Sequence, residues 1–387
     1  MRRGIATFTL DYGKCPPWLF ERMVKLGRAM VEVLIDEYGP DEFIRRIADP
    51  VWFQTLGTVL AFDWNASGLT TVLTGALKEA IRGQERDLGI FMAGGKGKTS
   101  RKTPDQILGW SERLNFRPTQ ANTLVRSSKL AAKVDSSLVQ DGYQLYHHVF
   151  FFSKNGAWAV VQQGMNTKTS SARRYHWFEE GSDPKNFVEE PHSGISSQVF
   201  YNRVLNLVAK SSNKTRDTSV ELVKNNINSL LKDIEIISSY SSPLSQSLRM
   251  KRGKEQMTLL KLERTEFTYH PVLQEEFQKS KYLQKILNRL KEISPKNYEE
   301  LIATEGVGPK TIRALALVAE VIYGAVPSYE DPARFSFAHG GKDATPYPVD
   351  TQTYDKTIET IRSAVRKSRM NPIDKDKALA RVSNLNS

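Results

Sequence analysis

The segment that decides the fold class is residues 143–164, which read YQLYHHVFFFSKNGAWAVVQQG. Two apolar runs flank the dipeptide Asn155-Gly156 in this segment. Asn-Gly between two apolar runs strongly indicates a β-hairpin, because both residues of a tight turn must take positive φ. The middle of the first half of the chain is therefore predicted to be antiparallel β-structure.

The turn also predicts which residues pair across the two strands. A two-residue turn places Lys154 opposite Ala157 and, further from the turn, His148 opposite Gln163. The apolar side chains then gather near the turn, while the histidines and glutamines gather at the far end of the hairpin. Residues 173–177 are predicted to add a third strand that carries more polar groups.

Helical patterns lie on both sides of this β-structure in the sequence. Apolar residues within 17–83 recur at three- and four-residue spacing, and Asp49-Pro50 suits the start of a second helical stretch. Residues 88–93 are short and apolar, which favours a buried strand. Helical patterns return at 219–237 and again at 272–304.

The predicted fold class is α+β and mainly helical, with a small antiparallel β-hairpin sheet in an N-terminal domain and a helical helix-hairpin-helix domain. We expect residues 1–208 to form the N-terminal α+β domain. Residues 209–260 are expected to be a helical connector with a serine-rich surface segment. Residues 261–387 are expected to form the helix-hairpin-helix domain, which resembles DNA-binding and glycosylase domains.

The charge of the chain suits a polyanionic partner. Lys and Arg total 55 against 43 Asp and Glu, which gives a net charge of +12. Phosphates attract such an excess, because lysines and arginines displace the counterions condensed on nucleic acids. The alternative is a basic protein whose charge serves solubility alone.

The chain has a single cysteine, Cys15, which excludes an intramolecular disulfide and a zinc finger. No apolar run is long enough for a transmembrane helix, and the N-terminus lacks the apolar core of a secretory signal. We therefore expect a cytoplasmic protein with no membrane partner and no cofactor.

A compact motif at Glu305–Thr311, EGVGPKT, follows one helical pattern and precedes another. Two glycines permit a sharp turn and a close backbone approach, and Pro309 suits the first turn of a helix whose N–H groups can bind a phosphate. The motif resembles the helix-hairpin-helix motif, and the DNA contacts are assigned to Gly306, Val307, Gly308 and Thr311. The alternative is an ordinary helical hairpin with a glycine turn.

The motif and the later Val349-Asp350-Thr351 together resemble DNA glycosylases of the endonuclease III type. The resemblance implies that Lys310 is the catalytic lysine and Asp350 the catalytic aspartate. It implies a DNA repair glycosylase with AP lyase activity that acts on duplex DNA containing a damaged base. The base would be an oxidised or deaminated pyrimidine such as a hydroxyuracil, and a lysine Schiff base would lead to β-elimination.

The sequence departs from the endonuclease III pattern in two ways. The four cysteines that ligate an iron–sulfur cluster are absent, so no cluster is expected. An insertion makes the interval between Lys310 and Asp350 39 residues long. This insertion either folds over a flipped base as a lid or breaks the match of the aspartate.

The whole chain resembles a prokaryotic domain-of-unknown-function family, number 763. The stretches that carry this resemblance are Asp49–Gln54, Ala93–Lys98, Gln140–His148, Gln162–Asn166 and Ala172–Trp177. The family implies little about chemistry, so the functional prediction rests on the C-terminal motif.

A basic glycine-rich segment follows the strand predicted at 88–93. It carries Lys96, Lys98, Arg101 and Lys102, but its glycine spacing does not match a P-loop. It is interpreted either as a loop that touches DNA phosphates or as a solvated surface turn.

Polar residues of the predicted sheet suggest a pocket for an extruded base. The candidates are His147, His148, Gln163, Tyr175 and, from the insertion, His339. A metal site is disfavoured, because adjacent histidines on a strand point to opposite faces. Hydrogen-bonded structural polar groups are the alternative.

Three functional hypotheses follow. The first is the glycosylase with lyase activity. The second is a metal-dependent DNA nuclease whose carboxylates lie in the N-terminal domain, with the hairpin acting only as a grip. The third is a DNA-binding protein without catalytic activity.

Overall fold

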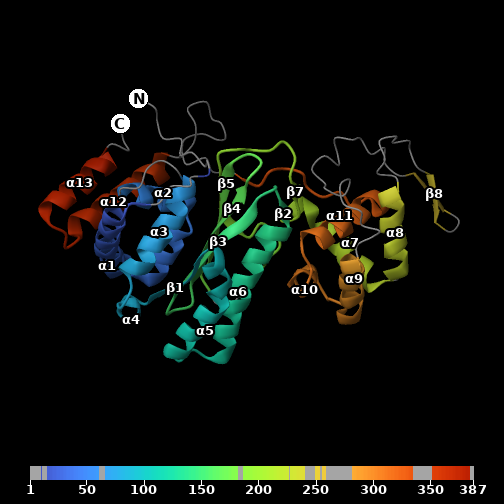
Figure 1. Ribbon diagram of the computed structural model, residues 1–387, viewed down its shortest axis with the longest axis horizontal. Helices are drawn as coiled ribbons and strands as arrows, with labels where there is room; N and C mark the ends of the chain where they lie inside the picture. The colour runs from blue at the N-terminus through green and yellow to red at the C-terminus, as the bar shows by residue number, and fades with distance from the viewer. Residues whose placement is uncertain are drawn as a thin grey trace.

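A computed structural model of the chain describes residues 10, 15–60, 66–181, 186–225, 227–239, 249–252, 255–258, 281–333 and 351–383. At its centre is a five-stranded antiparallel sheet in the order β1-β3-β4-β5-β6 (Figure 1). The strands are β1 (Ile90–Lys96), β3 (Gln144–Ser153), β4 (Trp158–Asn166), β5 (Ser171–Glu179) and β6 (His192–Ser197). Helices surround this small sheet, so the α+β, mainly helical prediction is confirmed.

Alternating side chains of the strands enter two separate hydrophobic cores. Phe151 and Val161 belong to one core, whereas their strand neighbours Phe150 and Val160 belong to the other. Successive side chains of a strand point to opposite faces, so the near-continuous apolar runs of β3 and β4 reflect burial on both sides. The sheet therefore lies between two helical layers.

The first layer joins the N-terminal helices to the C-terminal ones. Its helices are α1 (Pro17–Ile47), α2 (Pro50–Val59), α3 (Ala66–Ala80), α12 (Thr351–Lys367) and α13 (Pro372–Ser383). Asp49 caps α2 by accepting hydrogen bonds from the N–H groups of Val51 and Trp52 at 2.7 and 3.0 Å, which confirms the predicted helix start. Ile361 and Val365 of α12 are buried in the same core as α1.

The second layer covers the other face of the sheet and extends away from it. Its helices are α5 (Thr103–Arg113), α6 (Pro118–Ser137), α7 (Asn213–Lys224), α8 (Ile227–Ser239), α9 (Lys281–Ile293), α10 (Tyr298–Ala303) and α11 (Pro309–Tyr323). In Figure 1, α6 stands between the sheet and the group formed by α7 to α11. Residues predicted to form one domain at 261–387 thus contribute to two cores, with α9–α11 in one and α12–α13 in the other.

Short elements complete the described structure. They are α4 (Glu85–Leu88), the 3₁₀ helices η1 (Gly97–Lys102) and η2 (Lys210–Ser212), and the strands β2 (Val139–Gln140), β7 (Leu205–Asn206), β8 (Arg249–Arg252) and β9 (Glu255–Thr258). The strands predicted near 88–93 and 173–177 are confirmed as β1 and β5. Among the described helices, none combines the length and the apolar composition needed to cross a membrane.

The hairpin between β3 and β4 is confirmed, but its predicted register is wrong by one residue. Ser153, not Lys154, pairs with Ala157, through a backbone hydrogen bond of 2.9 Å, and Gly156 takes a φ of +105°. The hydroxyl of Ser153 also accepts the N–H groups of Asn155 and Ala157, at 3.2 Å each. These bonds favour a three-residue loop over the two-residue turn.

The slip changes the partner of His148. His148 lies opposite Gln162 in the sheet, whereas the prediction had placed it opposite Gln163. Side chains alternate between the two faces along a strand, so a register shift of one residue changes which residue of β4 lies beside His148 on its face of the sheet. His148 and Gln162 consequently point to the same face.

Candidate nucleic-acid interface and adjoining pocket

The glycine hairpin has the predicted shape. α10 ends at Ala303, a tight turn follows, and α11 begins at Pro309. Gly306 has a φ of +88°, and a Cβ at this position would lie 2.3 Å from Cδ1 of Ile286 in α9. The Tyr282 hydroxyl, also in α9, donates a hydrogen bond of 2.9 Å to the Gly306 carbonyl. The fold therefore requires glycine at 306.

The other residues assigned to DNA contact differ in exposure. Gly308 has extended backbone angles, and no described atom lies within 4 Å of the Cβ that a larger residue would place there. Val307 and Thr311 are 1% and 2% exposed, and the Val307 N–H donates to the Thr304 carbonyl, so neither residue offers much surface to a ligand. Lys310 is half-buried beside them at the start of α11. The first turn of a helix presents N–H groups without intrahelical acceptors, which suits a phosphate.

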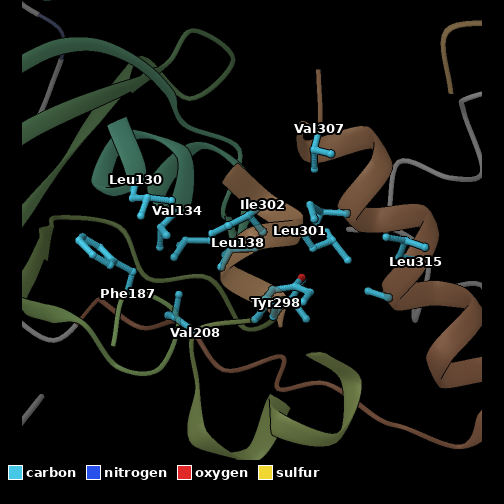
Figure 2. Close-up of a cluster of buried hydrophobic side chains, with 14 of the residues drawn as sticks. Leu130, Val134, Leu138, Phe187, Val208, Tyr298, Leu301, Ile302, Val307 and Leu315 are labelled. Carbon is cyan, nitrogen blue, oxygen red and sulfur yellow. The ribbon is translucent and has the colours of Figure 1, made fainter. Parts of the chain in front are cut away.

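The hairpin is fixed against the C-terminal end of α6. Figure 2 shows Leu301, Ile302 and Val307 of the hairpin in one apolar cluster with Val134 and Leu138. The Gln140 side-chain amide donates a hydrogen bond of 3.1 Å to the Pro309 carbonyl, and Arg126 forms an ion pair with Glu299 of α10. The position of the hairpin therefore depends on α6.

One face of α6 carries a row of cations, which we call the α6 ridge: Arg126, Lys129 and Lys133. These residues are three and four positions apart, so their side chains lie on one face of the helix. Arg126 and Lys129 are exposed, and partial burial lowers the pKa of Lys133. The ion pair with Glu299 places Arg126 next to the hairpin.

The basic segment predicted to touch phosphates forms the 3₁₀ helix η1 at the end of β1. Lys98, Arg101 and Lys102 are exposed, and Lys96 lies 5.9 Å from the ring centroid of Tyr146. The segment begins where β1 passes close to β3. At Gly94 a Cβ would lie 2.2 Å from the His148 carbonyl oxygen, which explains the glycine there.

A pocket of about 260 Å³ lies between η1 and α6. Its walls include Arg101 from η1, Ser128 and Lys129 from α6, and His147, His148 and Gln162 from the sheet. This volume is slightly below the roughly 300–1,000 Å³ of sites for drug-sized ligands, so it suits a group the size of a nucleobase.

The two adjacent histidines face opposite layers of the fold. His147 Nε2 is 3.1 Å from the Thr74 hydroxyl of α3, whereas His148 Nε2 is 2.8 Å from the Ser128 hydroxyl of α6. Burial lowers the pKa of His147 to about 3 and also lowers the pKa of His148. Both imidazoles are consequently neutral at pH 7.

His148 belongs to a buried chain of hydrogen bonds that ends on a carboxylate. Its Nδ1 lies 2.8 Å from Oε1 of Gln162, and Nε2 of Gln162 donates to Asp135 at 2.5 Å. Asp135 also accepts hydrogen bonds from Trp177 at 3.0 Å and from His192 at 2.5 Å. We call Ser128, His148, Gln162 and Asp135 the pocket relay.

The other predicted pocket residues lie elsewhere or outside the described residues. Gln163 donates to the Ser67 carbonyl at 2.9 Å and to the Tyr146 hydroxyl, on the face toward α3. Tyr175 is fully buried, and its hydroxyl donates to Asp141 at 2.7 Å. Neither residue lines the pocket. His339 and Asp350 fall outside the described residues.

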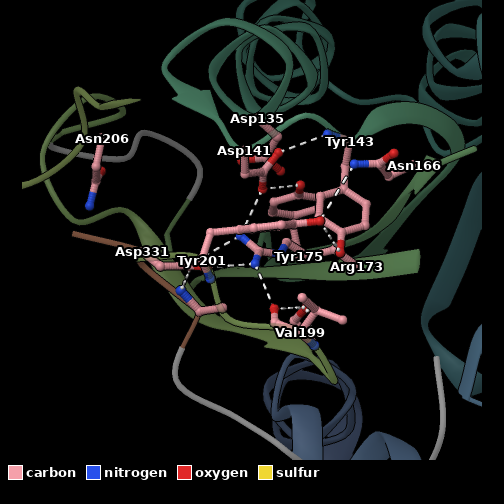
Figure 3. Close-up of polar contacts among 12 residues, drawn as sticks. Asp135, Asp141, Tyr143, Asn166, Arg173, Tyr175, Val199, Tyr201, Asn206 and Asp331 are labelled. Atoms are coloured by element: carbon pink, nitrogen blue, oxygen red, sulfur yellow. Dashed lines mark hydrogen bonds and ion pairs between the residues drawn. The ribbon is translucent and has the colours of Figure 1, made fainter. Parts of the chain in front are cut away.

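A buried arginine joins the segment after α11 to the sheet, as Figure 3 shows. Arg173 of β5 forms ion pairs with Asp141 at 3.0 Å and with Asp331 at 2.8 Å, and it donates to the Val199 carbonyl at 3.0 Å. Charge-assisted bonds of this kind are strong and directional. They hold the second helical layer at a defined position relative to the sheet.

A larger pocket of about 560 Å³ lies on the other side of η1 and α5. Its charged lining residues are the cations Lys78, Arg82, Lys102 and Arg113 and the acids Glu85 and Asp105. No residue of α6 lines this pocket, so it lies apart from the helix that supports the glycine hairpin. Within the described part of the chain, no group of three or more His, Cys, Asp or Glu side chains is placed to hold a metal ion.

Sequence reasoning did not identify Ser128 or Gln162 as site residues. Gln162 was missed because the predicted register paired His148 with Gln163. Ser128 and Asp135 lie on α6, and no sequence pattern links this helix to the face of β3 that carries His148.

The chain is a mainly helical α+β protein in which a glycine hairpin and a sheet-lined pocket share one supporting helix. Residues 4–349 match the family described as "Protein of unknown function (DUF763)", and the chain belongs to this family. Neither the curated proteins nor the solved structures that were searched gave a match. The resemblance to endonuclease III therefore stays a prediction.

Proposed function

We propose that this protein binds duplex DNA and removes a damaged pyrimidine, as a DNA glycosylase. The observation that carries the proposal is that α6 supports both the glycine hairpin and the nucleobase-sized pocket, and that its cations reach both, with Arg126 paired to Glu299 of the hairpin and Lys129 in the pocket wall. A glycosylase needs such a combination, because it must grip the backbone while one base leaves the stack.

The hairpin and the basic groups account for backbone binding. The open approach to Gly308 and the start of α11 suit a phosphate, and Lys129 and Arg101 continue the positive surface to the pocket. The net charge of +12 adds a general attraction to nucleic acid. Duplex DNA containing a damaged base is thus the proposed partner.

Two chemical routes are compatible with this function. In the first, Lys310 attacks the sugar and forms a Schiff base, with Asp350 as its carboxylate partner, and the protein acts also as an AP lyase. In the second, water attacks, and the protein is a glycosylase only. The routes differ in where the extruded nucleotide binds.

The two places where the nucleotide could bind, the pocket and the glycine hairpin, lie at different points along α6. Ser128 lines the pocket, whereas Gln140 follows the end of α6 and contacts Pro309. Roughly 14 Å of helix axis lies between Ser128 and the end of α6 at Ser137, at about 1.5 Å per residue. The lysine route thus requires the base to bind beside the hairpin, and the water route uses the pocket.

The test is incubation of the protein with duplexes that contain hydroxyuracil, uracil or an oxidised thymine, with undamaged duplex as control. We expect release of one of these bases. Borohydride is added in parallel, because it traps a Schiff base as a stable adduct. An adduct that is lost in Lys310→Gln supports the lysine route, whereas base release without an adduct supports the water route.

The same experiment separates the rival functions. Cleavage of undamaged DNA that a chelator abolishes would indicate the metal-dependent nuclease. Salt-sensitive binding with no released base on any duplex would indicate a DNA-binding protein without catalysis, and would contradict the glycosylase proposal.

A further inference from the structure

The pocket relay has a fixed direction of hydrogen bonding. The carboxylate of Asp135 only accepts, so the Gln162 amide must turn its NH₂ group toward Asp135 and its carbonyl toward His148. His148 Nδ1 must then carry the hydrogen. The neutral imidazole is left with a lone pair on Nε2, which accepts the hydroxyl hydrogen of Ser128 at 2.8 Å.

This direction of hydrogen bonding is the one that general-base catalysis needs. An imidazole whose Nδ1–H is held from behind presents Nε2 to a hydroxyl in front, and the group behind stabilises the imidazolium once the proton has moved. Here an amide carbonyl takes the rear position, and a buried carboxylate orients that amide. Ser128, His148 and Gln162 all line the pocket, so the relay adjoins any molecule bound there.

We propose that Ser128 and His148 form a general base that activates water for hydrolysis of the glycosidic bond of a nucleotide in this pocket. The proposal rests on the proposed function and assigns its chemistry to the water route. Gln162 and Asp135 are positioning residues, because they act through His148.

Hydrolysis forms one bond at C1′ and breaks another. The oxygen of water forms a bond to the sugar C1′ while the bond from C1′ to the base nitrogen breaks, and its electron pair leaves with the base. The proton of water passes to the Ser128 hydroxyl as the hydroxyl proton passes to His148 Nε2. The imidazolium then gives that proton to the departing base, which restores the neutral relay.

The electrostatic surroundings of His148 keep it in the accepting form before the reaction. Burial lowers its pKa, while the hydrogen bond to Gln162 and the charge of Asp135 oppose that shift. Arg101 of η1 and Lys129 of α6 also line the pocket, and His192 shares Asp135, whereas the imidazole of His147 turns to Thr74 on the other face of the sheet. Arg101 and Lys129 suit the phosphates on either side of a bound nucleotide.

The test measures single-turnover release of the damaged base by the full chain between pH 5 and pH 9. We expect Ser128→Ala and His148→Asn to lower the rate roughly 10²- to 10⁴-fold, the range for loss of a general base, with DNA affinity unchanged. Ser128→Thr keeps the hydroxyl and should retain most of the rate. The wild-type rate should rise through a pKa below 6.5, and His148→Asn should abolish this rise.

Ser127→Ala is the matched control, because it removes a buried hydroxyl from the neighbouring position of α6. Thermal unfolding of each variant shows whether a lost rate reflects a lost fold. A second measurement needs no variant: ¹⁵N NMR of the histidines in the wild-type chain should show His148 with its hydrogen on Nδ1. The opposite tautomer would overturn the proposal.

The outcomes separate the two proposals. If Ser128→Ala and His148→Asn release the base as fast as the wild type, the relay is not the general base, although the glycosylase proposal stands. If the wild-type protein releases no base from any duplex, the glycosylase proposal fails and the catalytic role of the relay fails with it.

Discussion

Gly306 and Gly308 are separated by one residue, Val307, and only Gly306 has a backbone conformation and surroundings that require glycine. Gly306 combines a φ of +88° with a close approach to Ile286, whereas Gly308 has an extended backbone and open space around its Cα. A glycine that the fold does not require is expected where a ligand comes close to the backbone. Substitutions at these two glycines can therefore distinguish an effect on folding stability from an effect on DNA binding.

We predict that Gly306→Ala lowers the free energy of unfolding by about 1–3 kcal/mol, through backbone strain and overpacking. Gly308→Ala should change it by less than about 0.5 kcal/mol. The same Gly308→Ala change should weaken duplex DNA binding about 10-fold, equivalent to about 1.4 kcal/mol, because a Cβ obstructs the phosphate. Urea unfolding and a DNA titration at fixed salt measure both effects. Undiminished affinity in Gly308→Ala would show that the hairpin does not contact DNA.

At the scale of the element, α6 both packs against the hairpin helices and forms part of the pocket wall. Its apolar side holds the hairpin helices, and its exposed side presents the α6 ridge beside the pocket. A lysine that contacts a phosphate contributes to the salt dependence of binding, whereas a lysine elsewhere does not.

We predict that Lys129→Gln makes the slope of log affinity against log salt concentration shallower by about 1, the value for loss of one phosphate contact. Lys377→Gln is the matched control, because Lys377 is exposed on α13 in the first helical layer. DNA titrations over a series of salt concentrations give both slopes. Equal slopes for the two variants would place the DNA away from the α6 ridge.

The elements themselves could be predicted from sequence wherever the signal is local. The Asp49 cap, the strands β1, β3, β4 and β5 and the glycine hairpin all follow from residues within a few positions of one another. The register of β3 and β4 could not, because the Ser153 side chain decides the loop length. The relay also could not, because its contacts join residues of α6 to two strands through tertiary packing.

At the scale of the whole molecule, the buried histidines make stability depend on pH. Burial lowers the pKa of His147 to about 3 and lowers the pKa of His148 and His176, whereas an unfolded chain has histidines near pKa 6.5. Below pH 6.5 the unfolded state therefore binds more protons than the folded state. Stability is complete above this pH and is lost as the pH falls toward the folded pKa values.

We predict that the free energy of unfolding falls between pH 6.5 and pH 5, with each of these histidines contributing up to about 1.4 kcal/mol per pH unit. Urea unfolding at a series of pH values measures the slope. His147→Gln should reduce the slope, because one titrating group is removed. A free energy that stays constant over this interval would show that the histidines are accessible to protons in the folded state.

The return of α12 and α13 to the first helical layer has a consequence for synthesis on the ribosome. Met23 and Met30 of α1 share a core with Ile361 and Ala378, which are translated more than 300 residues later. Until the late helices emerge, the face of α1 that they cover has no partner from this chain. The nascent protein must therefore keep an early hydrophobic surface from aggregating, and folding of this layer can finish only after α12 and α13 have been translated.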